Sequence, residues 1–213
     1  MHSKHTPHRD TRFWDRIAAK YARRPVKDQA AYEAKLTLLK SLLNQGDTVL
    51  EVGCGTGTTA LVLAPQVARY IATDISPEMM KIAEGKRVAA GADNVTFHVA
   101  TSTQMMPDAP FDAVMAFSLL HLVQDLPATL QALHDQLRPG GLFLSKTTCL
   151  AEANLAIRVM VKVMRLVGYA PHVLFLTQSE LKQALRDAGF EIEEVQHFGK
   201  DQMTPFFRAR RTA

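Results

Sequence analysis

The chain has 213 residues, of which 47% are hydrophobic and 22% are charged, and its formal net charge is +4. This composition excludes a collagen-like, disordered or disulfide-rich chain and is long enough for a sizeable core. The two cysteines give no disulfide framework, no apolar run is long enough to span a membrane, and the N-terminus lacks the apolar core of a signal peptide. We therefore expect one large cytoplasmic domain.

The first eight residues form a polar segment that contains a proline. His2, His5 and His8 recur at every third position, a spacing compatible with a metal site. Their neighbours are Ser, Lys, Thr and Pro, a context that favours a disordered tail over residues 1–8. We expect no metal site in this chain.

Residues 9–24 have the periodicity of an amphipathic helix. One face is aromatic and apolar and includes Trp14, and another face carries Arg12, Arg16, Lys20 and Arg23. The aromatic face either packs on the domain or lies on an anionic membrane surface, a setting that suits basic residues beside a tryptophan. After Pro25, a second helix is expected over about residues 28–44.

The most informative stretch runs from Thr48 to Ala60, where a short buried strand leads into a glycine-rich turn. Glycines recur at alternate positions after the strand, at Gly53, Gly55 and Gly57. Without side chains, these residues let the backbone turn tightly and let a ligand approach main-chain N–H groups. Either Thr58 or Thr59 is suited to cap the helix that follows. Such a strand–turn–helix unit binds nucleotide-like ligands in doubly wound sheets.

Two carboxylates make the glycine pattern more specific. Glu51 precedes the first glycine, which gives Glu-x-Gly-x-Gly-x-Gly, and Asp74 ends the next hydrophobic run. This pattern resembles motif I of the class I S-adenosylmethionine (SAM)-dependent methyltransferases. The resemblance implies SAM as the cofactor, with Glu51 ordering the turn and the methionine part of SAM lying against Gly53, Cys54, Gly55 and Gly57. A carboxylate at Asp74 can accept both ribose hydroxyls, but NAD enzymes share this feature, and Gly55-x-Gly57-x-x-Ala60 also fits their fingerprint.

Three later segments extend the resemblance. The run Asp74–Met80 resembles the family's second motif, Phe111–Phe117 resembles its Phe-Asp-x-Val strand, and Arg138–Ser145 resembles its Pro-Gly-Gly turn into the fifth strand. The Pro-Gly-Gly turn is absent from the dinucleotide fingerprint and therefore favours methyl transfer. In motif layout the chain is similar to small-molecule and lipid enzymes of the methyltransferase type 11 kind, such as the ubiquinone and menaquinone C-methylases.

The resemblance implies an α/β fold: a Rossmann-like, doubly wound sheet of seven strands whose last strand is antiparallel. Helices over residues 9–45 are expected to cover the cofactor, and residues 46–213 to form the methyltransferase domain, with a helical lid inserted over about 151–176. Tyr32 and Lys35 are then candidates to contact the cofactor carboxylate. The remaining cofactor contacts are expected from Ile75, Met79, Thr101, Ser102 and Phe117. Two of these residues, Thr101 and Ser102, stand where the family commonly has an aspartate, and a hydroxyl can still accept one hydrogen bond from the adenine.

The segment 154–167 is predicted to be an unusually apolar helix with Arg158, Lys162 and Arg165 along one face. A helix of this composition buries itself against the domain, roofs an apolar substrate pocket or sits on a membrane. We expect it to be the lid. Thr177 and Glu180 then form a capping box for the next helix, and the chain ends in two strands.

The expected activity is transfer of a methyl group from SAM to a small, apolar acceptor by in-line displacement, which requires alignment and the exclusion of water. His121 follows the fourth strand, where the methyl group and the acceptor are expected to meet. Its imidazole can either take a proton from an O–H or N–H acceptor or brace the loop beneath the cofactor.

Two alternatives remain open. One is a methyltransferase of phospholipid or quinone acceptors that docks peripherally on the inner membrane face through residues 9–24 and 154–167. The other is a non-catalytic SAM-binding interaction protein, which an acceptor screen would distinguish from an enzyme. No nucleic-acid partner is expected, because the basic residues lie on amphipathic helices rather than among stacking aromatic residues.

Overall fold

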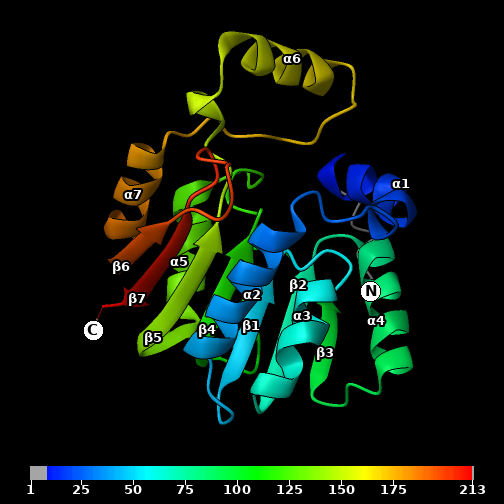
Figure 1. Cartoon of the computed structure of the whole chain (residues 1–213), viewed down its shortest axis with the longest axis vertical. Coiled ribbons are helices and arrows are strands. Elements are labelled where there is room, and N and C mark those ends of the chain that lie inside the picture. Colours follow the sequence, from blue (N-terminus) through cyan, green and yellow to red (C-terminus); the bar gives the residue numbers. More distant parts are fainter. Residues whose placement is uncertain (1–8, 213) are drawn as a thin grey trace, which may run out of the picture.

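The computed structural model describes residues 9–212, so the tail predicted over residues 1–8, with His2, His5 and His8, lies outside the described part. A seven-stranded sheet in the order β3-β2-β1-β4-β5-β7-β6 forms the centre of the molecule (Figure 1). Its strands are β1 (Thr48–Val52), β2 (Arg69–Asp74), β3 (Val95–Val99), β4 (Phe111–Phe117), β5 (Leu137–Lys146), β6 (Phe190–Gln196) and β7 (Phe206–Arg211). β7 pairs antiparallel with β5 and β6, and the other pairings are parallel. The predicted Rossmann-like α/β fold is therefore confirmed.

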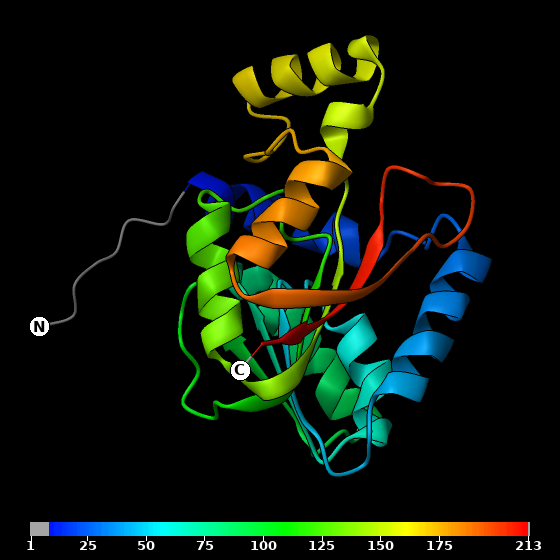
Figure 2. The same cartoon turned by 90° about the vertical axis from the view of Figure 1, so that its left-hand side faces the viewer.

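Helices cover both faces of this sheet. They are α1 (Arg9–Ala22), α2 (Gln29–Leu42), α3 (Thr58–Leu63), α4 (Pro77–Ala90), α5 (Leu126–Asp135), α6 (Leu155–Leu166) and α7 (Gln178–Asp187), with short 3-10 turns η1 (Ala64–Gln66) and η2 (Leu150–Glu152). Figure 1 shows α2 and α3 in front of the sheet, and Figure 2 shows α5 and α7 on its opposite face. This arrangement buries both faces of the central strands, as is usual for parallel sheets.

Two large apolar clusters, one on each side of the sheet, make up most of the core. Along β1, Val49 packs with the residues of α2 and α3, whereas Leu50 packs with those of α5 and α7. The same alternation continues in β5, where Phe143 joins the α5–α7 cluster and Leu144 joins the α2–α3 cluster. Because successive side chains of a strand point to opposite faces, a continuous apolar run is what a strand buried on both sides requires.

Several helix starts follow from local capping chemistry. Ser76 caps α4 by accepting a hydrogen bond from the Met79 N–H at 3.1 Å, with Pro77 in the first helical position. The predicted capping box is confirmed at α7, where Thr177 accepts a bond from the Glu180 N–H at 3.1 Å and the Glu180 carboxylate accepts one from the Thr177 N–H at 2.8 Å.

The expected threonine cap of α3 was wrong. The N-cap is Gly57, which has a φ of 72° and makes no side-chain cap. A Cβ at this position would lie 2.6 Å from the ring of Phe97, so the turn needs both the left-handed backbone and the missing side chain. The Thr58 hydroxyl instead accepts a hydrogen bond from Lys86 Nζ at 3.0 Å.

The Pro139-Gly140-Gly141 segment is part of β5 rather than a turn that precedes it. Leu137 already pairs with Phe111, and regular pairing resumes with Leu142 opposite Ala113. The intervening residues form a bulge, and Gly140 takes up a φ of 71° there. The preceding helix α5 ends at Asp135.

The lid segment, residues 151–176, stands above the carboxyl edge of the sheet and carries α6 at its top (Figures 1 and 2). α1 lies beside it and packs on α4, with Ala18 buried against Met79, Met80 and Ala83. The two N-terminal helices therefore pack against different parts of the protein. α1 packs on α4, whereas α2 packs on the face of the sheet.

We predict opposite stability changes for two glycine substitutions. Gly57→Ala should lower the free energy of unfolding by about 1–3 kcal/mol, because alanine is strained at positive φ and its Cβ collides with Phe97. Gly85→Ala, within α4, is the matched control: nothing lies within 4 Å of its added Cβ, and we expect a gain of about 0.4–1 kcal/mol. Urea unfolding measures both values, and equal effects at the two sites would contradict the strained turn.

Candidate active site

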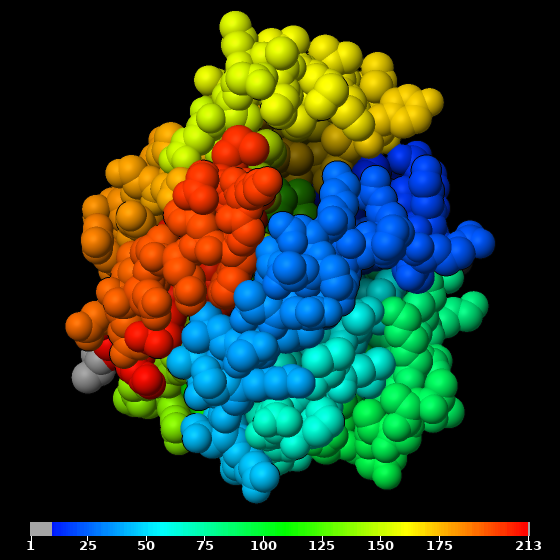
Figure 3. All heavy atoms as spheres, viewed as in Figure 1, coloured from blue at the N-terminus to red at the C-terminus, as the bar shows by residue number. Residues whose placement is uncertain are grey.

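The carboxyl ends of the parallel strands form the floor of a cavity of about 1040 Å³. The strand order runs outward from β1 to β3 on one side and from β4 to β5 on the other, so the β1–β4 boundary is the topological switch point where such sheets bind ligands. Figure 3 shows the lid segment (yellow) above a hollow between α2 (blue) and the loop over residues 197–205 (orange-red). The cavity is thus set between the sheet edge and the lid.

The glycine turn and Asp74 meet at this floor. Gly53, Gly55 and Asp74 all line the cavity. The Asp74 carboxylate accepts hydrogen bonds from the Gly55 N–H at 2.9 Å and from the Ser76 N–H at 3.0 Å, one on each oxygen. Burial raises the pKa of Asp74, and these main-chain donors act in the opposite direction. Each oxygen retains a lone pair that can accept a ligand hydroxyl.

The four residues expected around an adenine line the same cavity on the β2–β3 side. They are Ile75, Met79, Thr101 and Ser102. The Ser102 hydroxyl lies 3.3 Å from the hydroxyl of Thr129, and either group can be the donor. The pocket wall here is therefore apolar except for hydroxyl groups, with no carboxylate at the position that the family commonly gives to an aspartate.

Glu51 and Gly57 lie outside the walls of both cavities described here. Glu51 is 3% exposed and accepts a hydrogen bond from the Tyr70 hydroxyl at 2.8 Å beneath the turn. Burial raises its pKa to about 7, while the Tyr70 bond and the nearby Lys35 act to lower it. Gly57 packs against Phe97 and begins α3. Both residues shape the turn from behind rather than from the ligand side.

A smaller cavity of about 400 Å³ adjoins the larger one, and the two share Gly53, Phe117, Ser118 and Tyr21 as wall residues. Its wall also contains three residues expected near the cofactor, namely Tyr32, Lys35 and Cys54. Lys35 Nζ lies 4.3 Å from the ring centroid of Phe117 and 5.0 Å from that of Tyr32. Burial lowers the pKa of Lys35 to about 8, with Glu51 acting to raise it and Lys146 to lower it.

His121 lines the larger cavity next to the lid. Burial lowers the pKa of its imidazole to about 4, so the ring is neutral near pH 7. Its Nδ1 is buried and has no hydrogen-bond partner among the described residues. Its main-chain carbonyl accepts a bond from the Leu174 N–H of the lid segment at 2.7 Å. The main chain of His121 therefore supports the lid segment, while Nδ1 of its side chain is left without a hydrogen-bond partner among the described residues.

Most of the remaining wall of the large cavity is apolar, with Asp10, Gln124 and Asp125 among its polar residues, and it comes from segments far apart in the sequence. Residues 119–123 contribute several of its side chains, and the lid segment contributes Val161, Met164, Ala170, Pro171 and Val173. α1 secures this roof: Arg16 Nη2 donates to the Gly168 carbonyl at 2.9 Å, and the Asp10 carboxylate accepts from the His172 N–H at 3.1 Å. Val161 and Met164 of the segment 154–167 thus line the large cavity, and the role of this segment as a lid stays a prediction.

Sequence reasoning missed several wall residues. Tyr21 lines both cavities, and a Cβ built on Gly55 would lie 3.5 Å from its ring; its place on the aromatic face of residues 9–24 was a usable signal. Ser118 also lines both cavities and has a φ of 54°, which nothing in the sequence indicates. Lys146 lines the smaller cavity from the end of β5, where the sequence pattern marks only a strand.

Comparison with known proteins gives the family. A family profile described as a methyltransferase domain matches residues 20–195. The chain is 35% identical over 156 residues to a ubiquinone biosynthesis O-methyltransferase of Xylella fastidiosa, covering 70% of this chain and 63% of that protein. It is 30% identical to the protein of the same name from Pseudomonas paraeruginosa, covering 70% and 67%. The chain thus spans somewhat less than two thirds of the Xylella relative.

Solved structures share the fold at lower identity. The magnesium protoporphyrin IX methyltransferase of Synechocystis PCC 6803, solved with bound S-adenosylhomocysteine (SAH), aligns with a TM-score of 0.71 at 19% identity, over 95% of each chain. A complex of DhpI with SAH aligns with a TM-score of 0.74 at 23% identity, over 96% of each chain. With the profile match over most of its length, the chain belongs to the methyltransferase-domain family, and the resemblance to the class I SAM-dependent enzymes is confirmed.

Proposed function

We propose that the chain is a methyltransferase that binds SAM across the carboxyl edge of the sheet and methylates a small, apolar acceptor held beneath the lid. The observation that carries this proposal is that two adjoining cavities share Gly53 and Phe117 as wall residues. One part of the wall presents the glycine turn and the Asp74 carboxylate, and the rest is mostly apolar. A polar cofactor and an apolar acceptor can therefore bind side by side.

The cofactor contacts follow the cavity from β3 to β4. The adenine lies among Ile75, Met79, Thr101 and Ser102, and Asp74 accepts the ribose hydroxyls. The methionine part lies along Gly53, Cys54 and Gly55 towards the smaller cavity, where Tyr32 and Lys35 face it. Phe117 stands in both walls, beside the position of the sulfur. Glu51 and Gly57 act through the conformation of the turn, in keeping with their burial behind it.

The acceptor is a hydroxyl-bearing apolar molecule, and a quinone precursor fits this description. Support comes from the apolar residues that the lid segment contributes to the cavity and from the relatives, which are named ubiquinone biosynthesis O-methyltransferases. Bound SAM supplies an electrophilic methyl group on a positively charged sulfur. The chain aligns the acceptor oxygen, excludes water beneath the lid and offers the neutral His121 imidazole to the hydroxyl proton.

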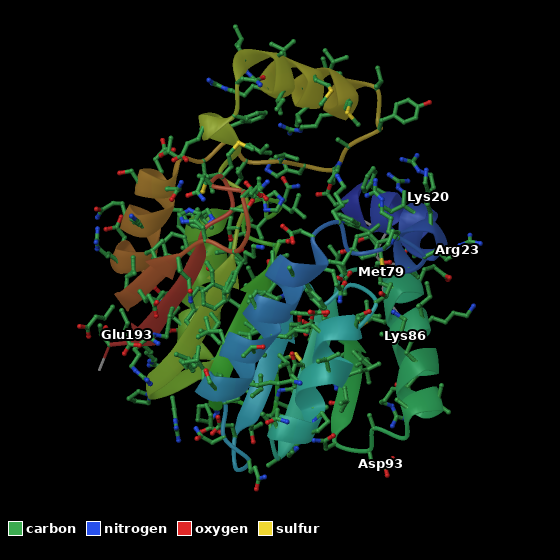
Figure 4. All side chains as sticks on the ribbon, viewed as in Figure 1. Lys20, Arg23, Met79, Lys86, Asp93 and Glu193 are labelled. Carbon is green, nitrogen blue, oxygen red and sulfur yellow. The ribbon has the colours of Figure 1, made fainter. Side chains whose placement is uncertain are left out.

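We further propose that the protein makes a peripheral contact with an anionic membrane. The face of α6 that points away from the cavity is apolar and exposed, with Leu155 71%, Val159 50%, Val163 51% and Leu166 83% exposed. Two exposed cations, Lys20 at the end of α1 and Arg23 just after it, lie below the lid segment and point outward (Figure 4). An apolar helix face with basic residues on a neighbouring helix suits an anionic lipid surface.

Two basic residues of α6 contact the lid loop. Arg165 donates to the Val173 carbonyl at 3.2 Å, and Lys162 Nζ lies 5.5 Å from the ring centroid of Phe175. These contacts hold α6 to the loop, and Lys162 itself remains exposed. No helix within residues 9–212 has the length and hydropathy needed to cross a membrane.

We predict that SAM and SAH bind and that NAD does not. Asp74→Ala should weaken SAH binding by about 1.5–3 kcal/mol, because it removes a charged acceptor for the ribose hydroxyls and for the Gly55 N–H. Asp93→Ala, at the far end of α4 (Figure 4), is the matched control and should leave the affinity unchanged. Calorimetry measures the binding of SAM, SAH and NAD to the wild-type chain and of SAH to the two variants. Tight NAD binding without a response to SAM would refute the proposed function.

We predict that His121→Asn lowers kcat by about a hundredfold and leaves SAH affinity unchanged, because the imidazole serves proton removal rather than cofactor binding. The pKa of His121, lowered to about 4, means that its protonation reduces the rate only as the pH falls towards 4, with no inflection near 6.5. His98→Asn on β3 is the exposed control. An unchanged kcat would leave His121 with only its bracing role.

We predict co-sedimentation with vesicles that contain anionic phospholipid at low salt, and release at high salt, because each basic residue near the surface contributes about 1 kcal/mol that salt screens. The double substitution Val159→Glu and Leu166→Glu should abolish it by placing charges on the apolar face of α6. Val88→Glu, on the exposed surface of α4, is the matched control. Absence of binding at low salt would exclude the membrane contact.

A further inference from the structure

Lys146 is an unassigned cation in the wall of the smaller cavity. It ends β5, and its side chain lines this cavity together with Lys35, Gly53 and Cys54. Its Nζ lies 5.8 Å from the ring centroid of Phe198. Among the described residues, its ammonium group forms neither a hydrogen bond nor an ion pair. A half-buried cation held only by an aromatic ring is well placed to receive an anionic group.

The second lysine of this wall strengthens the assignment. Lys35 is buried, and Lys146 is close enough to act electrostatically on it, lowering its pKa along with burial. Two ammonium groups beside one small cavity repel each other until an anion lies between them. Glu51 offsets part of this repulsion from behind the glycine turn, where it is bonded to Tyr70.

The carboxylates of the same wall are committed to the local backbone. Asp28 caps α2 by accepting a bond from the Ala31 N–H at 2.9 Å. Asp201 accepts bonds from the Met203 N–H at 2.9 Å and from the Thr204 hydroxyl at 2.6 Å. Neither carboxylate forms an ion pair with Lys35 or Lys146 in the described structure. The wall therefore carries two carboxylates that are bonded to the local backbone and two ammonium groups that are not paired with them.

We infer that Lys146 is a positioning residue for the cofactor: beside Lys35, its ammonium group binds the α-carboxylate at the amino-acid end, which the proposed function directs towards the smaller cavity. This inference rests on the proposed function. The two cavities adjoin at Gly53 and Phe117, which line both of them, so the methionine chain reaches the smaller cavity from the sulfur. An amino-acid end carries one carboxylate, which suits the two lysines, and one ammonium group, which suits the carboxylates of Asp28 and Asp201 in the same wall.

Lys146 also connects this subsite to the place of methyl transfer. Its main-chain carbonyl accepts a hydrogen bond from the Ser118 N–H at 2.7 Å, and Ser118 holds a left-handed φ of 54° where the two cavities meet. The side chain of Lys146 thus binds the carboxylate, and its main-chain carbonyl holds Ser118 in place. The assignment gives Lys146 a role in placing the sulfur relative to the acceptor wall.

The test compares two ligands that differ only in the carboxylate, SAH and decarboxylated SAH, by calorimetry on the full chain. Lys146→Met should weaken SAH binding about tenfold to a hundredfold, as expected for the loss of a charge-assisted hydrogen bond. Binding of decarboxylated SAH should change less than twofold. Lys146→Arg, which keeps the charge, should retain SAH affinity to within a few-fold. Lys40→Met, an exposed lysine of α2, is the matched control.

A loss of affinity that is equal for both ligands, or no loss for either, overturns the inference, because only a carboxylate contact discriminates between them. Lys146→Gln replaces the methionine variant if the latter does not fold. Failure of the proposed function is distinguishable: the wild-type chain would then bind neither SAM nor SAH, whereas failure of this inference leaves wild-type binding intact.

Discussion

The carboxylate of Asp74 is the interaction on which the rest of the site depends. It joins the glycine turn to the start of α4 by accepting the N–H groups of Gly55 and Ser76. The Ser76 hydroxyl in turn donates to Asp15 of α1 at 2.5 Å. A single network therefore connects β1, β2, α4 and the helix that holds the lid. The same carboxylate that meets a ligand also determines where the walls around that ligand stand.

Sequence reasoning succeeded where the deciding forces are local. A short buried apolar run located β1, and the capping box of Thr177 and Glu180 is chemistry between residues three positions apart. It failed where contacts between residues far apart in the sequence determine the local structure. The cap of α3 is a glycine because Phe97 leaves no room for a Cβ. Lys146 became a site residue only when the fold placed β5 beside α2.

The fold alone does not determine the chemistry. The cyclase SpnF aligns with this chain at a TM-score of 0.71 and 20% identity, although its name describes a different reaction from those of the methyltransferases with the same architecture. The function proposed for this chain depends instead on the site: the neutral His121, the two lysines and the apolar wall beneath the lid. These features lie in segments outside the glycine turn that identifies the family.

The attachment of the lid to α1 has a consequence for the order of events during turnover. Arg16 and Asp10 of this helix hold the lid loop, and Asp15 holds the helix on α4 beside the cofactor turn. Displacement of this one helix breaks both attachments, so access for the acceptor and access for the cofactor open together. Exchange of the spent cofactor and departure of the methylated product are then steps of a single opening, rather than two independent events.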